Sequence, residues 1–494
     1  MTAGDLPAWT GQPDQGFEGY RFVGYSLYEG LSDWDLSQRD KEVDIRPGLA
    51  TKWYPDPKDN KRWIFELRRD VKFHDGCDWN ADAAVANFKR LTDKTDPAFD
   101  PLNFARARSR TNDIAQVEKV DDYTIAIDTI SVSSLFPYNT PYVLMLSPCA
   151  LKAAGYNYQV YAKTPAGTGP YEFDKVVPHE RLELVKNPDY WDKTRVPKQD
   201  RVVLMPMPEA STRVAALLSG QVDWVEAPPP DAIDRLKSAG MQIVTNVYPH
   251  TWHYLLNVMN GPFKDLRVRE AANYAVNRDD MAEMLNGVAV PSYGIYVPAQ
   301  RYYGHPTEFK TDPVKATALL KEANCYPCAI SVAISTSGSG QMQPLPMNEL
   351  VKEQLEKAGF KVKFDTLDWN TVLTIYLQGA VKYPQYDAVN FSSGATDPLN
   401  FIKTVMSTYR SPNGANWGGF ADPKVDALAS QALSTFDDVE RTKVIVALHE
   451  LTVKDAARLF IVSDLNPRAL SPKVSGFVQA QSWFQDITSV VVAP

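Results

Sequence analysis

The chain has 494 residues, of which 44% are hydrophobic and 23% are charged. At about 150 residues per domain, this length predicts roughly three domains, and the composition lies far from that of disordered chains. The 52 basic and 60 acidic residues give a net charge of −8, which argues against nucleic acid or an anionic membrane as an electrostatic partner. No run approaches the ~18 consecutive apolar residues of a membrane span, and no basic-then-apolar signal segment precedes Asp5. We therefore expect a folded, soluble chain from which any export signal has been removed.

The first 165 residues favour a β-rich unit decorated with helices. Short β elements separated by turns are expected between residues 33 and 69. Asn80 can cap the N-terminus of a helix in which apolar residues recur near the helical period up to Leu91. The elements expected here are strands at 63–67 and 123–128, a helix from 80 to 91, and a loop over 137–148.

The middle of the chain continues with short strands and two helices. A turn at 166–170 precedes three strand-like runs, and Gly220 is placed to end the first helix. The second helix is expected to be long and to end at Asn286 and Gly287. The expected strands are 171–173, 182–185, 202–205, 222–224 and 252–258, and the expected helices are 209–218 and 266–285.

The clearest fold signal lies between residues 331 and 391. A strand at 331–336 is followed by a helix with an apolar stripe that stops at Gly359, and then by a strand at 362–367. This β-α-β unit is extended by a helix at 370–378 and a strand at 386–391. Consecutive strands joined by helical crossovers are parallel, so this part predicts a doubly wound α/β lobe.

In such a sheet, ligands bind in the crevice beyond the carboxyl ends of the strands. Those ends are followed by Ser335–Gly338, Asp368–Trp369 and Ser392–Gly394. Three polar or aromatic loops therefore converge on one rim, which is the candidate binding region.

The four cysteines allow three pairings, which the sequence does not separate. Cys325 and Cys328 form the one close pair. A redox Cys-x-x-Cys motif places its first thiolate at a helix N-terminus, whereas a strand-like run follows here. We expect a disulfide that closes a turn, or unreactive thiols, rather than redox or metal chemistry.

The common catalytic motifs are absent from the sequence. It contains no Gly-x-Ser-x-Gly elbow, no phosphate loop and no complete Gly-x-Gly-x-x-Gly. The six histidines are scattered, and on a strand His250 and His253 would point to opposite faces, so no metal site is expected. Asp368 and Asp397 lie on the predicted rim, where a hydrolase using this carboxylate pair is the alternative function, although solvated loop carboxylates are the commoner case.

Several segments, in order along nearly the whole chain, closely resemble the family 5 extracellular solute-binding proteins, which are the peptide, nickel and oligosaccharide receptors of ABC importers. The segments that carry this resemblance are Leu27-Tyr28-Glu29-Gly30-Leu31, Pro47 to Trp53, Trp63 to Gly76, Gly167 to Tyr171, Asn187 to Trp191, Leu218 to Asp223, Asn257, Leu266 to Ala271 and Ala275 to Arg278.

The resemblance implies an α/β fold of the bilobal periplasmic-binding-protein (flytrap) type with an extra β-rich domain. Lobe I would comprise residues 1–30, 166–262 and 468–494, the added domain residues 31–165, and lobe II residues 263–467. The family's first strand normally precedes the segment that matches Thr2 to Gly4, so we expect the chain to be trimmed there together with its signal peptide.

The resemblance also implies a receptor in place of an enzyme. A ligand that contacts both lobes stabilises the closed form, which the permease recognises, and this needs no catalytic group. We therefore expect a monomer in the periplasm, or tethered outside the membrane, whose partners are a small-molecule ligand and the permease subunits of an ABC transporter, with no cofactor, metal or nucleic acid.

For the ligand class, the resemblance points away from ordinary dipeptides. Peptide-binding relatives carry an acidic residue in the turn before an Asp-Pro pair, where Ala395 stands, and dipeptide-binding relatives carry an Arg in the loop that matches 335–340, where none occurs. An oligosaccharide, an opine-like conjugate or a modified peptide is expected, and a nickel chelate is an alternative. The predicted ligand-binding residues are Gln12, Asp14, Gln15, Trp252, Ser337, Trp369, Ser392, Ser393, Asp397, Asn416 and Trp417.

Overall fold

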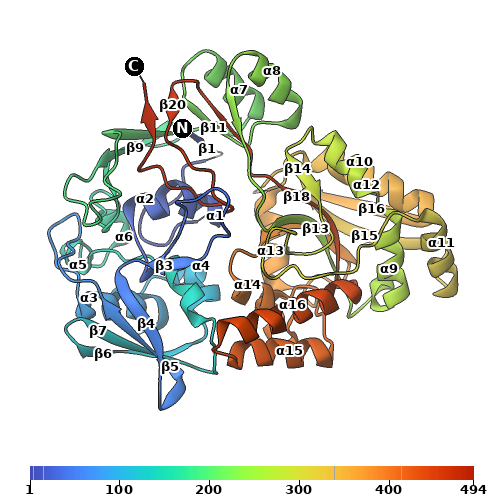
Figure 1. The fold of residues 1–494 in the computed structure, drawn as a ribbon, viewed down its shortest axis with the longest axis horizontal. Coiled ribbons are helices and arrows are strands. Elements are labelled where there is room, and N and C mark those ends of the chain that lie inside the picture. Colours follow the sequence, from blue (N-terminus) through green and yellow to red (C-terminus); the bar gives the residue numbers. More distant parts are fainter. Residues whose placement is uncertain (4, 15, 339, 413, 494) are drawn as a thin grey trace. The chain divides into compact units, whose positions relative to one another are not determined.

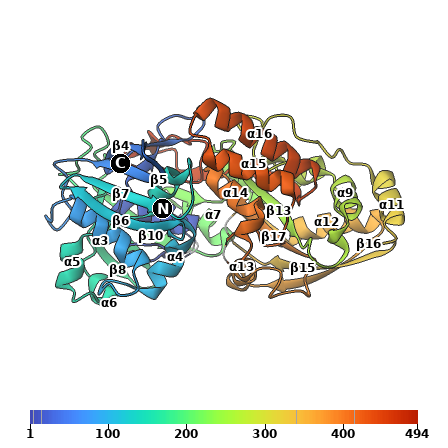
Figure 2. The ribbon, with the colours of Figure 1, turned by 90° about the horizontal axis from the view of Figure 1, so that it is seen from below.

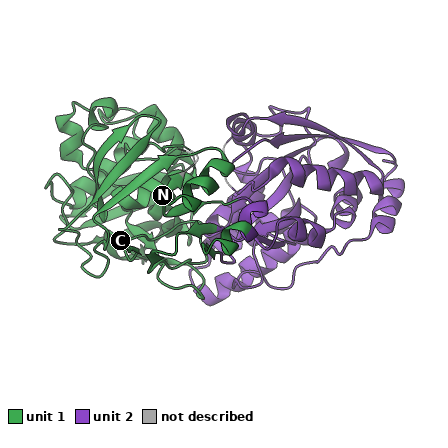
Figure 3. Cartoon of the chain, turned by 90° about the horizontal axis from the view of Figure 1, so that it is seen from above, with its two compact units in different colours: residues 1–228, 235–244, 468–494 green, residues 229–234, 245–467 purple. Residues whose placement is uncertain are grey.

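The computed structural model describes residues 1–3, 5–14, 16–338, 340–412 and 414–493. The chain forms two compact units (Figure 3). Unit 1 comprises residues 1–228, 235–244 and 468–494, and unit 2 comprises residues 229–234 and 245–467. None of the helices that the structure describes is long and apolar enough to span a membrane.

Unit 1 is built from short sheets. Two of them have four strands each, in the orders β1-β10-β9-β8 and β4-β5-β7-β6, and the smaller ones have the orders β11-β19-β12, β2-β3 and β20-β21. The strands are β1 (Thr2–Ala3), β2 (Ser32–Trp34), β3 (Ile45–Pro47), β4 (Ala50–Asp56), β5 (Asp59–Leu67), β6 (Ile114–Asp121), β7 (Thr124–Thr129), β8 (Tyr171–Val177), β9 (Arg181–Lys186), β10 (Arg201–Pro206), β11 (Trp224–Glu226), β12 (Gln242–Val244), β19 (Arg468–Leu470), β20 (Val474–Ser475) and β21 (Val491–Val492).

The helices of unit 1 are mostly short, and several begin at a residue whose side chain caps the first turn. Asn80 does so as expected, because its side-chain oxygen accepts a hydrogen bond of 3.0 Å from the backbone nitrogen of Ala83. The helices are α1 (Phe17–Gly19), η1 (Tyr20–Gly24), α2 (Tyr25–Leu27), α3 (Ala81–Thr92), α4 (Pro101–Thr111), η2 (Phe136–Tyr142), α5 (Pro148–Ala153), α6 (Tyr158–Tyr161) and α7 (Ala210–Leu218), while η3 (Pro230–Ala232) and α8 (Ile233–Ser238) lie where the chain passes between the units.

The expected separation of residues 31–165 as an added domain stays a prediction. The sheet β4-β5-β7-β6 lies wholly inside this range, as the β-rich pattern predicted. These residues are nevertheless grouped with the rest of unit 1. Part of the expected loop at 137–148 is a 3-10 helix, η2, in which proline occupies an early position.

Unit 2 contains one six-stranded sheet, in the order β14-β18-β13-β17-β15-β16. Strand β15 pairs in parallel with both β16 and β17, which confirms the predicted β-α-β units. Strand β13, by contrast, is antiparallel to both of its neighbours, β17 and β18, so the sheet is mixed. The strands are β13 (His250–Leu256), β14 (Ala289–Pro291), β15 (Cys328–Ser335), β16 (Phe360–Leu367), β17 (Ala388–Gly394) and β18 (Arg458–Asp464).

The position of β13 corrects one expected boundary. Residues up to 262 were expected in lobe I. All seven residues of β13 are buried and pair with β17, and residues 251–255 pair with β18 as well, so residues 245–262 belong to unit 2. The pairing of strands distant in sequence decides this boundary, which no local pattern marks.

Helices cover both faces of the six-stranded sheet (Figures 1 and 2). Side chains of β13 reach α12 on one face, where the Tyr254 hydroxyl donates to Asn348, and α13 on the other, where Leu255 packs with Val372 and Ile375. Helices α15 and α16 lie side by side. The helices are α9 (Leu266–Ala275), α10 (Arg278–Met284), α11 (Pro313–Glu322), α12 (Pro344–Ala358), α13 (Trp369–Gln378), α14 (Pro398–Val405), α15 (Pro423–Ser434) and α16 (Asp438–Lys454), with 3-10 turns η4 (Pro262–Lys264) and η5 (Ser407–Tyr409).

The expected long helix at 266–285 is wrong, because the structure has two helices there. Val276 is extended, and the side chain of Asn277 caps α10 by accepting from the backbone nitrogens of Asp279 and Asp280. An asparagine at this position offers the backbone a competing hydrogen bond, which ends α9 and caps the start of α10. The expected end of α12 at Gly359 is confirmed, where φ is 109°.

All four cysteines are paired, as Cys77–Cys149 and Cys325–Cys328. The first disulfide joins residues 72 apart in sequence, a loop whose closure stabilises the fold by about 4 kcal/mol in the chain-entropy model. The second closes the turn before β15, which is one of the two alternatives expected from the sequence.

Unit 1 also buries a carboxylate, Glu29, which is 6% exposed. It accepts hydrogen bonds from the Tyr190 hydroxyl at 2.6 Å, from Trp191 Nε1 at 2.7 Å and from the Thr168 hydroxyl at 2.9 Å. Burial raises the pKa of Glu29 to about 7, even though these donors favour the charged form.

This pKa predicts how the stability of a Glu29→Gln variant depends on pH. The ordinary value is 4.5 and the folded value is about 7, so the contribution of Glu29 is full below pH 4.5 and is lost as the pH rises through 7. Glutamine does not titrate, so the free energy of unfolding of the variant should improve relative to wild type by on the order of 3 kcal/mol between pH 4.5 and pH 8. Urea unfolding across this range measures the difference.

The glutamine amide lies among three donors and costs stability at every pH, so the variant can be less stable than wild type throughout. The prediction therefore concerns how the difference in unfolding free energy between variant and wild type changes with pH. Glu66, whose side chain is 44% exposed, provides the control, since Glu66→Gln should follow wild type throughout. A difference between Glu29→Gln and wild type that does not change between pH 5 and pH 8 would contradict the raised pKa.

Candidate functional site

The candidate site lies at one edge of the six-stranded sheet of unit 2. Parallel pairing brings the carboxyl ends of β15, β16 and β17 to the same edge. Antiparallel pairing adds the start of β13, where His250 lies opposite Gly394, and the end of β18. We call this the strand-end edge, defined by Ser335, Leu367, Gly394, His250 and Asp464.

Asp464 organises the polar groups of the strand-end edge. Its carboxylate accepts from the Tyr248 hydroxyl at 2.7 Å and from the backbone nitrogen of Asn466 at 2.8 Å, and its second oxygen lies 2.5 Å from His250 Nδ1. The Tyr248 and His250 rings are stacked with centroids 5.5 Å apart. All three side chains are at most 3% exposed, so Asp464 fixes the start of β13 to the end of β18 by charge-assisted hydrogen bonds.

A glycine-containing loop closes over this cluster. A Cβ on Gly340 would lie 2.1 Å from His250 Cε1 and 3.0 Å from the Ser392 hydroxyl, and a Cβ on Gly338 would lie 2.5 Å from the Trp369 ring. Both glycines have positive φ, which other residues rarely adopt. The loop backbone therefore lies directly against an imidazole and an indole.

The loop continues into a hydrogen-bonded chain of side chains. Trp252 Nε1 donates to Gln341 Oε1 at 2.9 Å, and Gln341 Nε2 lies 3.5 Å from the Ser392 hydroxyl. Trp252 is fully buried, and its ring meets Tyr254 edge-on. Trp252 and Ser392 thus lie at the strand-end edge, held within its hydrogen-bonded network, and their role in ligand binding stays a prediction.

The other predicted residues at this edge are more exposed. Trp369 is half-buried at the start of α13 and stacks on Phe391 with ring centroids 5.3 Å apart. Ser337 is exposed and Ser393, at the end of β17, is half-buried. Trp369 is therefore held by Phe391 and by the Gly338 backbone, and its side chain stays half-exposed.

The two rim carboxylates are helix caps. Asp368 accepts from the backbone nitrogen of Thr371 at 3.1 Å and caps α13, while Asp397 accepts from the backbone nitrogen of Asn400 at 2.6 Å and caps α14. Asp397 is 1% exposed. The alternative of a hydrolase that uses this pair is not retained, because both carboxylates stabilise helix N-termini.

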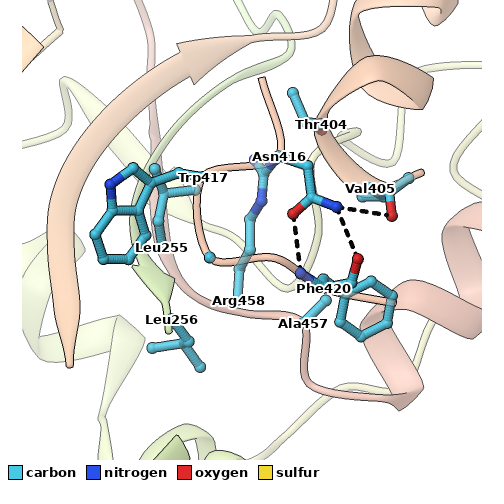
Figure 4. Close-up of a pocket in the computed structure, with 10 residues that line it drawn as sticks. Leu255, Leu256, Thr404, Val405, Asn416, Trp417, Phe420, Ala457 and Arg458 are labelled. Atoms are coloured by element: carbon cyan, nitrogen blue, oxygen red, sulfur yellow. Dashed lines mark hydrogen bonds between the residues drawn. The ribbon is translucent and has the colours of Figure 1, made fainter. Parts of the chain in front are cut away.

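Asn416 and Trp417 were predicted on the rim, and this placement is wrong. Trp417 is 1% exposed, packs in the core with Leu255 and Val372, and donates from Nε1 to the Ile375 carbonyl. The side chain of Asn416 forms two hydrogen bonds with the backbone of Phe420, in its own loop. Both residues lie near Leu256, at the opposite edge of the sheet (Figure 4), because the loop after α14 returns to the amino ends of the parallel strands.

The predicted residues of unit 1 are engaged within that unit. Gln12 is fully buried, its backbone nitrogen donates to Asn103, and its amide lies 3.0 Å from the Tyr20 hydroxyl. Asp14 accepts from the backbone nitrogen of Ala8 at 2.7 Å and lies 3.4 Å from Arg106. Gln15 lies outside the described residues.

Tyr248, Gln341 and Asp464 were not predicted from the sequence, and His250 was considered there only as a metal ligand, together with His253. Asp464 and His250 are 214 residues apart, so no spacing motif connects them. Among the residues that the structure describes, no group of three or more His, Cys, Asp or Glu side chains is arranged to hold a metal ion.

Comparisons with known proteins agree with the resemblance seen in the sequence. Residues 44–413 match the model of the bacterial extracellular solute-binding proteins, family 5 Middle. The glutathione-binding protein GsiB of Escherichia coli (strain K12) is 28% identical over 464 residues, which are 92% of this chain and 86% of that protein.

Two solved structures share the fold. The ABC transporter-associated periplasmic binding protein DppA from Helicobacter pylori, in complex with the peptide STSA, has a TM-score of 0.83 at 23% identity, with 99% of this chain and 97% of that chain covered. The periplasmic binding protein AgaA from A. tumefaciens R10, in complex with agropinic acid, has a TM-score of 0.79 at 22% identity, with 100% and 98% covered. The fold is thus that of the bilobal periplasmic binding proteins.

The contact between the glycine loop and His250 can be tested with two glycine substitutions in unit 2. Gly340 and Gly287 both have positive φ, but nothing lies within 4 Å of a Cβ on Gly287. Gly287→Ala should cost about 1–2 kcal/mol of stability from backbone strain alone. Gly340→Ala should cost a further 1–3 kcal/mol or so, because the new methyl group meets His250. Urea unfolding measures both, and equal losses would show that the loop does not pack on His250.

Proposed function

The chain belongs to the bacterial extracellular solute-binding proteins of family 5 and is a solute-binding receptor for an ABC importer, and we propose that its ligand is a small polar molecule other than an ordinary dipeptide. Proteins of this family bind small ligands and act with ABC transporter permeases as transport receptors, not as enzymes. The proposal therefore concerns which ligand the strand-end edge selects.

The chemistry of the strand-end edge carries this proposal. Its side chains are hydroxyl, amide and aromatic groups together with the buried Asp464–His250 pair, and the carboxylates of Asp368 and Asp397 are occupied as helix caps. Residues 335–341 contain no Arg or Lys that could pair with a peptide carboxylate, and Ala395 occupies the turn before the Asp397-Pro398 pair. Such an edge suits recognition by hydrogen bonds and by ring stacking, in place of ion pairs to the two charged ends of a peptide.

Trp369 is the residue we propose for ring stacking. It is half-buried, rests on Phe391, and stands beside the exposed Ser337 loop. A tryptophan held in this way loses little freedom when a ligand packs against the exposed part of its ring. Ser337, Ser392 and Ser393 would then supply polar contacts around it.

The relatives favour two ligand classes among those expected from the sequence. The 28% identical relative is named for glutathione, which supports a modified peptide, and AgaA was solved with agropinic acid, which supports an opine-like conjugate. An oligosaccharide is the third class that the aromatic ring would suit. We propose further that the receptor acts in the periplasm as a monomer without a cofactor, metal or nucleic acid, which the periplasmic relatives support as to location.

A thermal-shift screen tests the ligand class. The panel is ordinary dipeptides, glutathione, opine-type conjugates, oligosaccharides and chelated nickel. A ligand present at 100 times its dissociation constant adds roughly 2.7 kcal/mol to the native state, so a true ligand is readily seen. We expect the largest rise in melting temperature from glutathione, an opine-type conjugate or an oligosaccharide. If an unmodified dipeptide gives the largest rise instead, the proposal is overturned.

The role of Trp369 can be tested once the screen has identified a ligand. Trp369→Ala should weaken binding by about 1–3 kcal/mol through loss of the stacking surface, with the fold retained because the ring is half-exposed. Isothermal titration and urea unfolding, applied together, separate affinity from stability.

Trp53→Ala is the matched control, since Trp53 is a half-buried tryptophan on β4 of unit 1. It should leave the affinity unchanged. Unchanged affinity in Trp369→Ala as well would remove that ring from the proposed site.

A further inference from the structure

Unit 2 buries guanidinium groups without a carboxylate partner, and the structure shows how such a group is normally satisfied. Arg278 is 2% exposed. Its three nitrogens donate to the carbonyl oxygens of Ser292, Phe460, Asn273 and Phe309 and to the side-chain oxygen of Asn273, at 2.9–3.1 Å. A full set of acceptors replaces the water that the cation loses on burial.

Arg458, at the start of β18, lacks such a set. It is 5% exposed, and Nη1 lies 3.3 Å from His253 Nε2. Within the part of the chain that the structure describes, its guanidinium has no other hydrogen-bond acceptor and no carboxylate within 4 Å. The remaining N–H groups of this buried cation are therefore unmatched by protein atoms.

His253 does not balance the charge. Its Nδ1 lies 3.0 Å from the Thr251 carbonyl oxygen, to which it donates, so Nε2 carries the lone pair that accepts from Arg458. Burial, and then the positive charge of Arg458, lower the pKa of His253 well below its usual value. Burial also lowers the pKa of Arg458 to about 10, which leaves the guanidinium charged at neutral pH.

A small cavity adjoins Arg458 (Figure 4). It has room for roughly one water molecule. The residues that line it are Leu255, Leu256, Thr404, Val405, Asn416, Trp417, Gly418, Phe420, Ala457 and Arg458.

The other polar side chains of the cavity are already satisfied. Asn416 Nδ2 donates to the carbonyl oxygens of Phe420 and Met406, at 2.7 and 3.2 Å, and its Oδ1 accepts from the backbone nitrogen of Phe420. The Thr404 hydroxyl donates to the Phe401 carbonyl at 2.7 Å. The cavity therefore combines apolar walls with one cation and no negative charge among its lining residues.

We propose that this cavity binds a small monovalent inorganic anion, with chloride as the physiological example, and that Arg458 is its ligand. An uncompensated buried charge costs several kcal/mol, and a counter-ion in contact with the guanidinium removes most of that cost. Because the cavity is small, we expect a single monatomic ion there in preference to sulfate or a carboxylate-bearing organic anion. The site lies at the opposite edge of the sheet from the strand-end edge, so it is separate from the proposed ligand site.

The first test is the chloride dependence of stability. Urea unfolding is followed from 1 mM to 300 mM sodium chloride, with sodium gluconate added to keep the ionic strength constant. An ion that binds the native state alone lowers the unfolding equilibrium constant by up to tenfold for each tenfold rise in its concentration above the dissociation constant. Equal stability in chloride and gluconate would overturn the proposal.

Variants locate the effect. Arg458→Met removes the charge, keeps the volume and should abolish the chloride dependence, while Arg458→Lys should retain part of it. Arg235→Met removes an exposed charge from α8 and should keep the full dependence. A chloride dependence that survives in Arg458→Met would place the ion elsewhere.

A direct observation does not depend on the variants folding. Wild-type crystals grown or soaked in sodium bromide should show an anomalous difference peak beside the Arg458 guanidinium, within the cavity drawn in Figure 4. A peak confined to the protein surface, or a cavity that holds water with no anomalous signal, would overturn the proposal.

Discussion

The backbone pairing of β13 is the constraint on which unit 2 depends. This strand lies between β17 and β18, is antiparallel to both, and all seven of its residues are buried. Its side chains alternate between the α12 face, which Tyr254 reaches, and the α13 face, which Leu255 reaches. A shift of one residue in this register would exchange the two faces, so the packing of both helix layers is tied to one strand.

The same strand connects the two proposed sites. His250 and Trp252, near its beginning, join the strand-end edge through Asp464 and Gln341. His253 and Leu255, near its end, face Arg458 and the cavity. A strand that pairs with a neighbour on each side can hold a polar cluster at one edge and a buried cation at the other, because most of its backbone groups are already satisfied.

The charged groups at the strand-end edge serve the fold. Asp368 and Asp397 cap α13 and α14, and Asp464 is surrounded by three donors. What this edge would offer the proposed ligand is thus hydroxyl groups, amides and the ring of Trp369. In the proposed site, selectivity would come from the geometry of hydrogen bonds and stacking, and the glycine loop brings its backbone against Trp369 and His250.

Much of the local structure of this protein follows from its sequence alone. The cap at Asn80, the helix end at Gly359 and the β-α-β units around β15 were all predicted, because caps, left-handed glycines and apolar periodicity act over a few residues. The family was also recognisable from sequence segments that follow one another in the family's order along the chain.

The tertiary structure decided what depends on distant residues. Val276 and Asn277 break a helix whose apolar pattern continues, Trp417 enters the core instead of the rim, and β13 joins unit 2. Asp464 meets His250 across 214 residues, and Arg458 meets His253 across 205. Such pairs are set by strand order and register, whose energies arise only once the sheet has formed, so no local sequence pattern encodes them.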